Sequence, residues 1–462
     1  MILTADIGTT SLKAAFIDFD GKHKAFSRFA YPMGSVAAVW EKAFKRILKD
    51  LHAQNPDGKI DGICVSGNGP TLVPVTREGD ALTPLYWFES TEKTAARSLF
   101  LPHVVSLKEK VPYLYENAAQ FFSSHEWLAY RLGADAFTAL PQEEYTPYYW
   151  DEEQCALFGL DIKKFPPFIK MGSLAGKVSA KAAGLYRSLG LKSGIPIIVG
   201  APDFISALIG TGVLKAGDVC DRAGSSEGIN FYASSSESAE VKNPGALLRA
   251  GLRVLPHVKK GYCNIGSLIP VSGRLFESYR ICTNQESRSY EALLAELIPS
   301  EQVPSEQVPK EFNTRLFQQV LPQLGSALTS PAGIHNDKTA IGRSVLCAIG
   351  FSVRSAVETL ESQGFPVKAM RVSGGQGKNP LWNQLKADVS GVSLLIPEIC
   401  DGELAGNAVL AACALENPPD GDFERVLDAT ALRMIRFREE YAPRAEMSQF
   451  WAERYKIAKN AV

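Results

Sequence analysis

A short pattern of an acid, a glycine and hydroxyl residues occurs twice in this chain. The first copy is Asp6-Ile7-Gly8-Thr9-Thr10-Ser11 and the second is Asp221-Arg222-Ala223-Gly224-Ser225-Ser226. An apolar, strand-like segment follows each copy, as in a hairpin with a tight turn. Either copy alone is explained as well by an ordinary hairpin. Two copies heading two halves of similar length indicate a duplicated fold.

Strand-like and helix-like segments alternate along the rest of the chain, which predicts an α/β architecture. Strands are predicted over 2–6, 12–18, 60–66, 197–199, 229–232 and 369–372, and a hairpin over 72–75 and 82–87. Helices are predicted over 36–51, 339–363, 381–389 and in the charged tail from about 426 to 459. The polar segment 283–313, with a proline-bounded near-repeat over 299–309, predicts an exposed loop or insertion.

Length and composition limit the class of protein. A chain of 462 residues suits two domains, which we expect over 1–217 and 218–430, followed by a helical tail over 431–462. The formal net charge is -1, with 49 basic and 50 acidic residues, so neither nucleic acid nor a membrane is an expected partner. Eight cysteines without a CxxC pair and an N-terminus unlike a signal peptide favour a cytoplasmic protein with reduced thiols.

The first turn has the features of a phosphate-binding loop. Its backbone N–H groups and the hydroxyls of Thr9 and Thr10 can face a phosphate chain, and Lys13 can add positive charge. Asp6, at the end of the preceding strand, can hold a hydrated Mg²⁺, because this cation favours carboxylate, water and phosphate oxygens. An ordinary hairpin with a surface lysine is the alternative.

Two later segments also combine a strand, a glycine and a helix. In Val199-Gly200-Ala201-Pro202-Asp203 a carboxylate follows a strand, where it can accept a proton from a hydroxyl, or simply cap the next helix. In Ser373-Gly374-Gly375-Gln376-Gly377-Lys378-Asn379 the glycines allow a close approach of backbone to ligand. The spacing is not the GxGxxG of dinucleotide sites, and the chain contains no Walker GxxxxGK[ST] motif.

With these elements in order, the chain resembles the FGGY family of carbohydrate kinases, within the sugar kinase, actin and Hsp70 superfamily, and within it the xylulokinase-like branch. The resemblance covers nearly the whole chain. Its further motifs are Ser66-Gly67-Asn68, Trp87, Leu128-Ala-Tyr-Arg-Leu132, Gly217-Asp218-Val219, Asn379-Pro380-Leu381-Trp382 and Glu403-x-Ala405-x-Asn407-Ala408.

The resemblance implies two actin-like, ribonuclease-H-like domains with ATP and sugar in the cleft between them. It implies that the γ-phosphoryl group of ATP is transferred to a hydroxyl of a small sugar or polyol, with a pentulose such as xylulose the nearest guess. The residue roles it implies are Asp203 as general base; Asp6 for Mg²⁺ through water; Thr9, Thr10, Lys13, Gly224, Ser225 and Ser226 for phosphates; Gly374, Gly375 and Asn379 for adenosine; and Asn68, Trp87, Glu89 and Asp203 for the sugar. A homodimer is an open option.

The departures from the family pattern fall on the sugar side. They are Asn68, Pro70, Glu89, Thr91, His125 and Phe204. A kinase for another small alcohol and a catalytically silent sugar-binding regulator are therefore the alternatives. Charge neutralisation and positioning dominate phosphoryl transfer, so we expect the phosphate loops and Asp203 to carry the mechanism.

Overall fold

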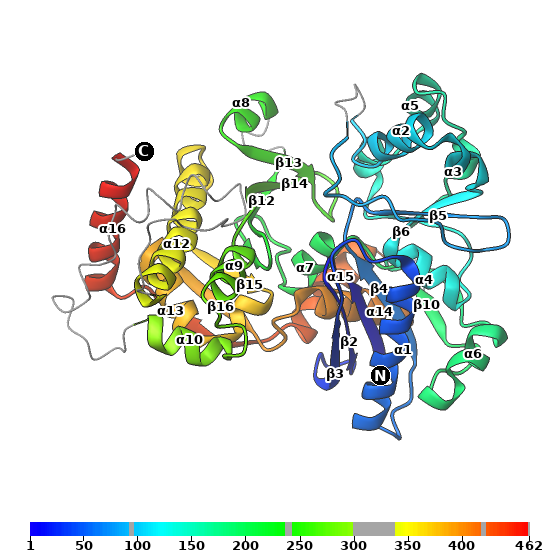
Figure 1. Ribbon diagram of the computed structural model, residues 1–462, viewed down its shortest axis with the longest axis horizontal. Coiled ribbons are helices and arrows are strands. Elements are labelled where there is room, and N and C mark those ends of the chain that lie inside the picture. Colours follow the sequence, from blue (N-terminus) through cyan, green and yellow to red (C-terminus); the bar gives the residue numbers. More distant parts are fainter. Residues whose placement is uncertain (92–96, 236–242, 299–337, 417–421, 461–462) are drawn as a thin grey trace. The chain divides into compact units, whose positions relative to one another are not determined.

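The computed structural model describes residues 1–91, 97–235, 243–298, 338–416 and 422–460. They form two compact units, each built from several segments of the chain (Figure 1). The first unit comprises Met1–Gly212, Pro256–Lys260 and Asp401–Arg436, and the second comprises Val213–Leu255, Gly261–Cys400 and Phe437–Val462. The domain boundaries predicted after residues 217 and 430 stay a prediction.

A six-stranded sheet forms the centre of the first unit, in the order β3-β2-β1-β4-β10-β9. The strands are β1 Ile2–Ile7, β2 Ser11–Ile17, β3 His23–Ala30, β4 Gly62–Gly67, β9 Leu174–Lys177 and β10 Pro196–Ile198. β1 to β3 form an antiparallel meander, whereas β4 runs parallel to both β1 and β10. β1 and β4 are buried along their whole length, as expected for strands covered on both faces.

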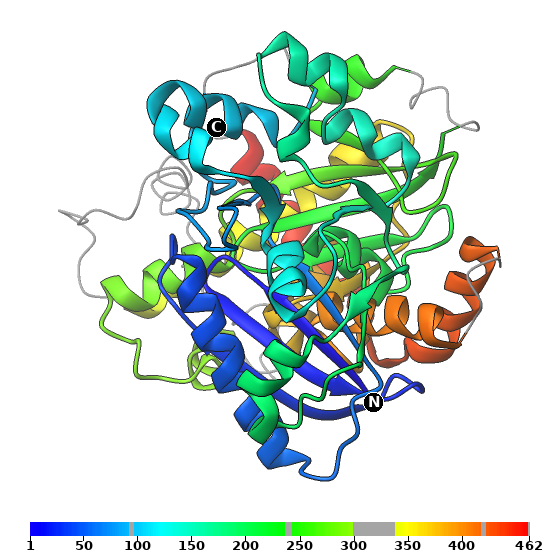
Figure 2. The same ribbon diagram turned by 90° about the vertical axis from the view of Figure 1, so that its right-hand side faces the viewer.

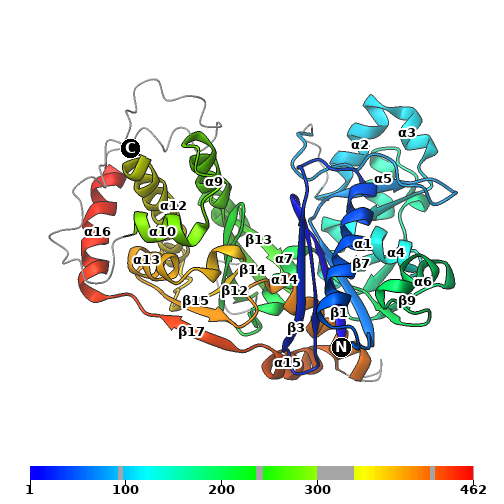
Figure 3. The same ribbon diagram turned by 60° about the horizontal axis from the view of Figure 1, so that its bottom comes forward.

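Helices from distant parts of the chain cover this sheet. α1 (Ala37–Gln54) packs on β2 and β3 and buries Trp40, Phe44 and Ile47 at helical spacing (Figure 2). α14 (Gly402–Glu416) packs on β1 and β4, and with α15 (Phe423–Met434) it lies beside the N-terminal strands (Figure 3). A segment more than 400 residues along the chain thus completes the core of the first unit.

The backbones of α7 (Asp203–Gly210) and α14 are in close contact. A Cβ atom on Gly406 would lie 1.9 Å from the carbonyl oxygen of Ser206, and one on Gly210 would lie 1.9 Å from that of Gly402. Only glycine fits at either position. The first turns of these two helices carry the carboxylates Asp203 and Glu403.

The second unit repeats this sheet. Its order is β13-β14-β12-β11-β15-β16-β17. The strands are β11 Val219–Ala223, β12 Glu227–Ser234, β13 Leu252–Pro256, β14 Tyr262–Ile269, β15 Ala369–Ser373, β16 Ser393–Pro397 and β17 Phe437–Tyr441. From β14 to β17 every neighbouring pair has the same relative direction as its counterpart from β3 to β9. The predicted duplication is confirmed.

The two acids of the repeated pattern are nevertheless not equivalent. Asp6 precedes the turn glycine Gly8 by two residues, whereas Asp221 precedes Gly224 by three. The two glycines correspond, because each donates its N–H across its turn, to Ser11 in one unit and Ser226 in the other. Side chains alternate between the two faces of a sheet along a strand. When the two sheets are matched at these glycines, the carboxylates of Asp6 and Asp221 therefore lie on opposite faces.

The remaining elements lie around the two sheets. In the first unit they are β5 Leu72–Val75, α2 Leu101–Lys110, α3 Pro112–Asn117, β6 Gln120–Ser123, α4 Ser124–Leu132, β7 Thr138–Leu140, α5 Glu152–Leu157, β8 Phe168–Lys170 and α6 Ala180–Tyr186, with 3₁₀ turns at Glu143–Tyr148, Ile162–Lys164 and Arg187–Leu189. In the second unit they are α8 Pro244–Arg249, α9 Gly273–Cys282, α10 Tyr290–Leu297, α12 Lys338–Ser362, the 3₁₀ turn η6 Gly375–Lys378, α13 Pro380–Ser390 and α16 Ala445–Asn460.

Three sequence predictions differ from the structure. β5 forms its sheet with β6, and the segment 82–87 forms no strand of its own, although it is joined to β5 by antiparallel backbone hydrogen bonds between Leu72 and Leu85 and from Leu82 to Pro74. Within the predicted loop 283–313, α10 forms and buries Leu293 and Leu297, while residues 299–313 lie outside the described residues. In the predicted helical tail, β17 forms an edge strand, because its exposed charged residues suit an edge.

The contact between α7 and α14 yields a test. Gly406→Ala should lower the free energy of unfolding by about 1–3 kcal/mol, the usual cost of overpacking, and lower the melting temperature. Gly184→Ala is the matched control, because Gly184 lies in helix α6 with open space around its Cβ position. It should be neutral or stabilise by up to about 1 kcal/mol. Equal melting temperatures for the two variants would contradict this packing.

Candidate active site

The turn between β1 and β2 is held by contacts to its carbonyl groups. Tyr31 donates its hydroxyl to the carbonyl of Gly8 at 2.7 Å and its N–H to that of Thr10 at 2.9 Å. The hydroxyl of Thr9 accepts from the indole N–H of Trp87 at 3.2 Å. One predicted sugar residue, Trp87, therefore lies directly against one predicted phosphate residue.

Asp6 and Lys13 are register partners across this hairpin and belong to a cluster of charges. Lys13 Nζ lies 2.9 Å from Asp401 Oδ1. Burial lowers the pKa of Lys13, but the carboxylates of Glu403, Asp401 and Asp6 outweigh this and raise it above its usual value. Lys13 therefore stays charged.

The pKa of Asp6 is raised to about 8. Burial is the largest cause, followed by the negative charge of Glu403; Asp203 adds to the rise, while Lys13 and a hydrogen bond from Ser66 oppose it. An ionised Asp6 therefore requires additional positive charge nearby. Sequence reasoning assigned no role to Glu403 or Asp401, although Glu403 stands in one of the motifs that carry the resemblance.

A chain of buried hydrogen bonds orients Asp6. Ser66 Oγ donates to Asp6 Oδ1 at 2.8 Å, and Asn407 Nδ2 donates to Ser66 Oγ and to the carbonyl of Ala5, both at 2.9 Å. Ser206 Oγ donates to Asn407 Oδ1 at 3.0 Å. Residues of β1, β4, α7 and α14 thus fix one carboxylate, a positioning role that the sequence did not reveal for Ser206 or Asn407.

Asp203 is the first residue of α7, and Pro202 occupies the N-cap position without a capping side chain. The half-buried carboxylate of Asp203 accepts a hydrogen bond from the N–H of Phe204 at 2.6 Å. The bridge between Gly67 and Pro202 brings the start of α7 beside the end of β4. The backbone of Asp203 therefore lies next to that of Asn68. The carboxylate of Asp203 is also near enough to Asp6 for its negative charge to raise the pKa of Asp6.

Several buried polar atoms near the end of β4 lack hydrogen-bond partners among the described residues. They are Asn68 Nδ2, Thr71 Oγ1 and both ring nitrogens of His125. Burial lowers the pKa of His125 to about 3, so the ring is neutral, and its 3.9 Å separation from Glu126 is too long for a hydrogen bond. Such atoms mark a place where a polar ligand can supply the missing partners. Glu89, in contrast, is exposed.

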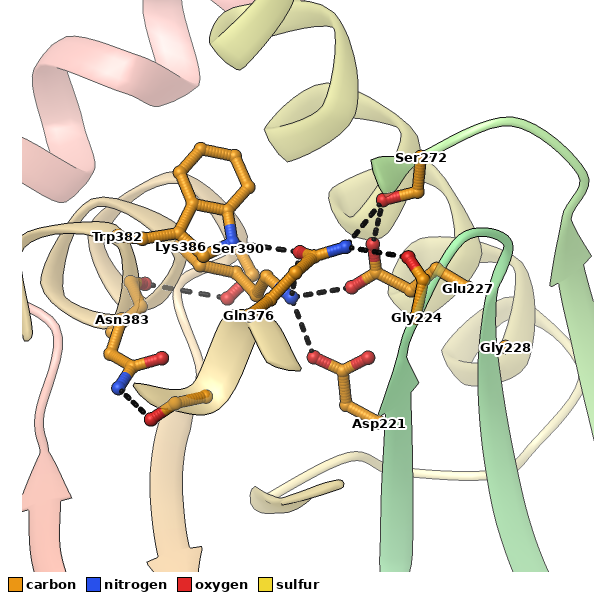
Figure 4. A network of polar contacts seen from close by, with 12 residues as sticks. Asp221, Gly224, Glu227, Gly228, Ser272, Gln376, Trp382, Asn383, Lys386 and Ser390 are labelled. Carbon is orange, nitrogen blue, oxygen red and sulfur yellow. Dashed lines mark hydrogen bonds and ion pairs between the residues drawn. The ribbon is translucent and has the colours of Figure 1, made fainter. Parts of the chain in front are cut away.

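In the second unit the turn between β11 and β12 lies against the start of α9 (Figure 4). The carbonyls of Gly224 and Ser225 accept N–H groups of Gly273 at 3.2 Å and of Arg274 at 3.0 Å. A Cβ on Gly273 would meet the Gly224 carbonyl oxygen at 2.4 Å, so glycine permits this approach. The turn therefore has its carbonyls directed to α9.

The glycine-rich segment of the second unit lies against the same turn. Gly374 has φ +106, and a Cβ there would lie 2.5 Å from the carbonyl oxygen of Ala223. Gly375 begins η6 and is exposed, and Asn379 caps α13 by accepting the N–H of Trp382 at 3.1 Å. The predicted residues of the second unit, from Gly224 to Ser226 and from Gly374 to Asn379, thus come together.

The charge cluster of the first unit fits a hydrated Mg²⁺. In the parts of the chain that the structure describes, no three His, Cys, Asp or Glu side chains are grouped to hold a metal directly. Mg²⁺, however, usually keeps several waters and takes one or two carboxylates. Asp6 supplies a buried carboxylate with a raised pKa, and Glu403 Oε2 is buried without a hydrogen-bond partner among those residues.

Comparison with known proteins gives consistent results. The N-terminal domain model of the FGGY family of carbohydrate kinases matches residues 86–210, and the C-terminal domain model matches residues 307–415. Xylulose kinase of Bacillus subtilis is 22% identical, over 99% of this chain and 96% of that protein. Autoinducer-2 kinase of Yersinia pestis is also 22% identical, over 96% of this chain and 91% of its own.

Solved structures agree on the fold. A gluconate kinase from Lactobacillus acidophilus superposes with a TM-score of 0.75 at 18% identity, covering 100% of this chain and 97% of its own. This likeness confirms the predicted two-domain, actin-like α/β fold. No helix of the described residues is long and apolar enough to cross a membrane.

The raised pKa of Asp6 predicts a pH-dependent stability. The folded protein keeps this proton up to about pH 8, whereas the unfolded chain releases it near 3.8, so ligand-free stability falls as the pH rises between these values. The substitution Asp6→Asn removes the titrating group and therefore this fall in stability at high pH. The ligand-free variant should melt at a higher temperature than the parent at pH 8, with the difference shrinking toward pH 4.

The same substitution at the exposed Asp57 is the control and should leave the melting temperature unchanged across this range. A difference between parent and Asp6→Asn that is constant from pH 4 to pH 8 would rule out the raised pKa of Asp6.

Proposed function

We propose that Asp203 is the general base of this protein. The chain belongs to the FGGY family of carbohydrate kinases, whose members are ATP-dependent sugar kinases. The carboxylate would accept the proton of a hydroxyl of a small sugar or polyol as that oxygen attacks the γ-phosphorus of ATP. The location proposed for the reaction is the cytoplasm.

The observation that carries this proposal is the position of Asp203. Its half-buried carboxylate stands at the start of α7, beside the buried polar atoms at the end of β4, and acts electrostatically on Asp6. A general base must lie near both the acceptor hydroxyl and the phosphates. The position of Asp203, beside these polar atoms and near Asp6, is consistent with both requirements. Asp6 is buried and, in the ligand-free protein, keeps its own proton up to about pH 8, so it is less suited to receive the proton of the hydroxyl.

The other residues would position and neutralise the phosphates. Backbone N–H groups and hydroxyls at Thr9 and Thr10 would bind the phosphate chain, and Lys13 would add positive charge. In the second unit Ser225 and Ser226 would bind phosphate, and the segment from Gly374 to Asn379 would contact adenosine. When bound, Mg²⁺ neutralises charge on the phosphates, and Asp6, with Glu403 nearby, would hold it through water.

The acceptor is proposed to be a neutral polyhydroxy compound, with a pentulose such as xylulose first. The buried Asn68 Nδ2 and Thr71 Oγ1 and the neutral ring of His125 support this, because hydroxyl groups can satisfy both donors and acceptors. The relative named xylulose kinase is the basis for naming xylulose.

A coupled assay of ADP release with Mg²⁺ and ATP tests the activity over pentuloses, hexuloses, polyols and aldonates. Release that depends on one neutral sugar or polyol supports the proposal. A preference for an aldonate would contradict the proposed acceptor class. Sugar binding by calorimetry without ADP release from any compound would favour the silent sugar-binding regulator.

Asp203→Asn tests the general base. This variant should bind Mg²⁺–ADP like the parent but lose at least about 10²-fold in turnover number, the usual loss on removing a general base. The matched control is Asp57→Asn, which should retain parent turnover. Phosphorylation by Asp203→Asn within a few-fold of the parent would show that another group accepts the proton.

A further inference from the structure

A lysine is buried beneath the second turn, in the second unit. Lys386 lies on α13 and is 1% exposed. Its Nζ lies 2.9 Å from Asp221 Oδ2 on β11 and also contacts Glu227 Oε1 at the start of β12 (Figure 4). Both carboxylates are fully or almost fully buried. Burying three ionisable groups costs desolvation energy, so their arrangement requires an explanation.

The three groups balance one another in charge. Burial, followed by the charge of Glu227, raises the pKa of Asp221 well above its usual value and so favours its protonated form. Burial opposes ionisation of Glu227, but Lys386 overcomes this and lowers its pKa. The result is a neutral set of one ammonium, one carboxylate and one carboxylic acid. Without Lys386, the carboxylate of Glu227 would be left buried without its counter-charge.

The network extends from Lys386 to the turn itself. Ser272, which precedes α9, donates its hydroxyl to Glu227 Oε2 at 2.5 Å. Gln376 Nε2 donates to Ser272 Oγ at 2.9 Å and to the carbonyl oxygen of Gly224 at 3.2 Å. Lys386 therefore connects with the turn through Glu227 and Ser272, which hold the start of α9 against it.

Lys386 also reaches the glycine-rich segment. Its Nζ donates to Gln376 Oε1 at 3.3 Å, and Trp382 Nε1 donates to the same oxygen at 2.7 Å. The amide of Gln376 is thus fixed from both ends, by Lys386 and Trp382 at its oxygen and by the turn and Ser272 at its nitrogen. One buried cation joins β11, β12, η6 and α13, which carry or flank the second turn and the glycine-rich segment.

We propose that Lys386 is a positioning residue for nucleotide binding, which fixes the turn from Gly224 to Ser226 relative to the segment from Gly374 to Asn379. This inference rests on the proposed function, in which these two segments bind the phosphates and adenosine. Lys386 is too deeply buried to contact a ligand itself, so its effect passes through Glu227, Ser272 and Gln376.

Calorimetric titration with Mg²⁺–ADP tests this without knowledge of the sugar. Lys386→Met matches the aliphatic part of the lysine side chain and removes its ammonium group. Its dissociation constant for ADP should rise about tenfold or more, the scale for residues that orient a binding group. Lys368→Met is the matched control, since Lys368 is an exposed lysine of the same unit and should keep parent affinity.

Affinity is compared below the melting temperature of each variant, where the protein is folded. A merely structural lysine would lower the melting temperature but leave the affinity of the folded protein unchanged, and that outcome would overturn the proposal. Lys386→Arg, which keeps the charge, should recover part of the affinity.

A second variant serves if Lys386→Met does not fold. Gln376→Leu removes the hydrogen bonds that join Lys386 to the Gly224 carbonyl through Gln376, without leaving a buried charge, and it should also weaken ADP binding at least several-fold. Parent affinity in this variant would overturn the proposal. ADP binding by the parent without phosphorylation of any sugar would contradict the proposed function alone, whereas a parent that binds no ADP would contradict both.

Discussion

Buried carboxylates beside a hairpin turn are the constraint on which both units depend. Each sheet places its first hairpin at the centre, and each buries acidic side chains next to the turn. A carboxylate removed from water must be neutralised or protonated. The contacts around the two turns neutralise or protonate these carboxylates in two different ways.

The first unit leaves its charge incompletely balanced. The carboxylates of Glu403, Asp401 and Asp6 act on Lys13, while burial, followed by the charges of Glu403 and Asp203, raises the pKa of Asp6. The hydrogen-bond chain through Ser66 and Asn407 holds Asp6 in place although its ionised form is unfavourable. Such strain is expected where a cation or a transferred group completes the site. In the second unit Lys386 supplies the missing charge from within the protein.

The sequence predicted the architecture well because the relevant signals are local. The strands at Ile2–Ile7 and Ala369–Ser373 and the helix at Ala37–Gln54 follow from periodicity and turn residues. Strand β17 was missed because its charged residues suit a solvent-exposed edge and not a buried strand. The contacts that fix the site were also missed, because Asn407 and Lys386 meet partners 341 and 165 residues away. No local pattern encodes such pairs, whereas the positions of the two turns follow from local glycine and hydroxyl residues.

The most direct test of the central claim is to follow the phosphoryl group itself. Phosphorus NMR of the protein with Mg²⁺, ATP and an accepted sugar would resolve ADP, phosphate and the sugar ester together. We expect sugar phosphate and ADP in equal amounts, with little inorganic phosphate. ATP hydrolysis to inorganic phosphate at the same rate with and without sugar, and no ester, would contradict it.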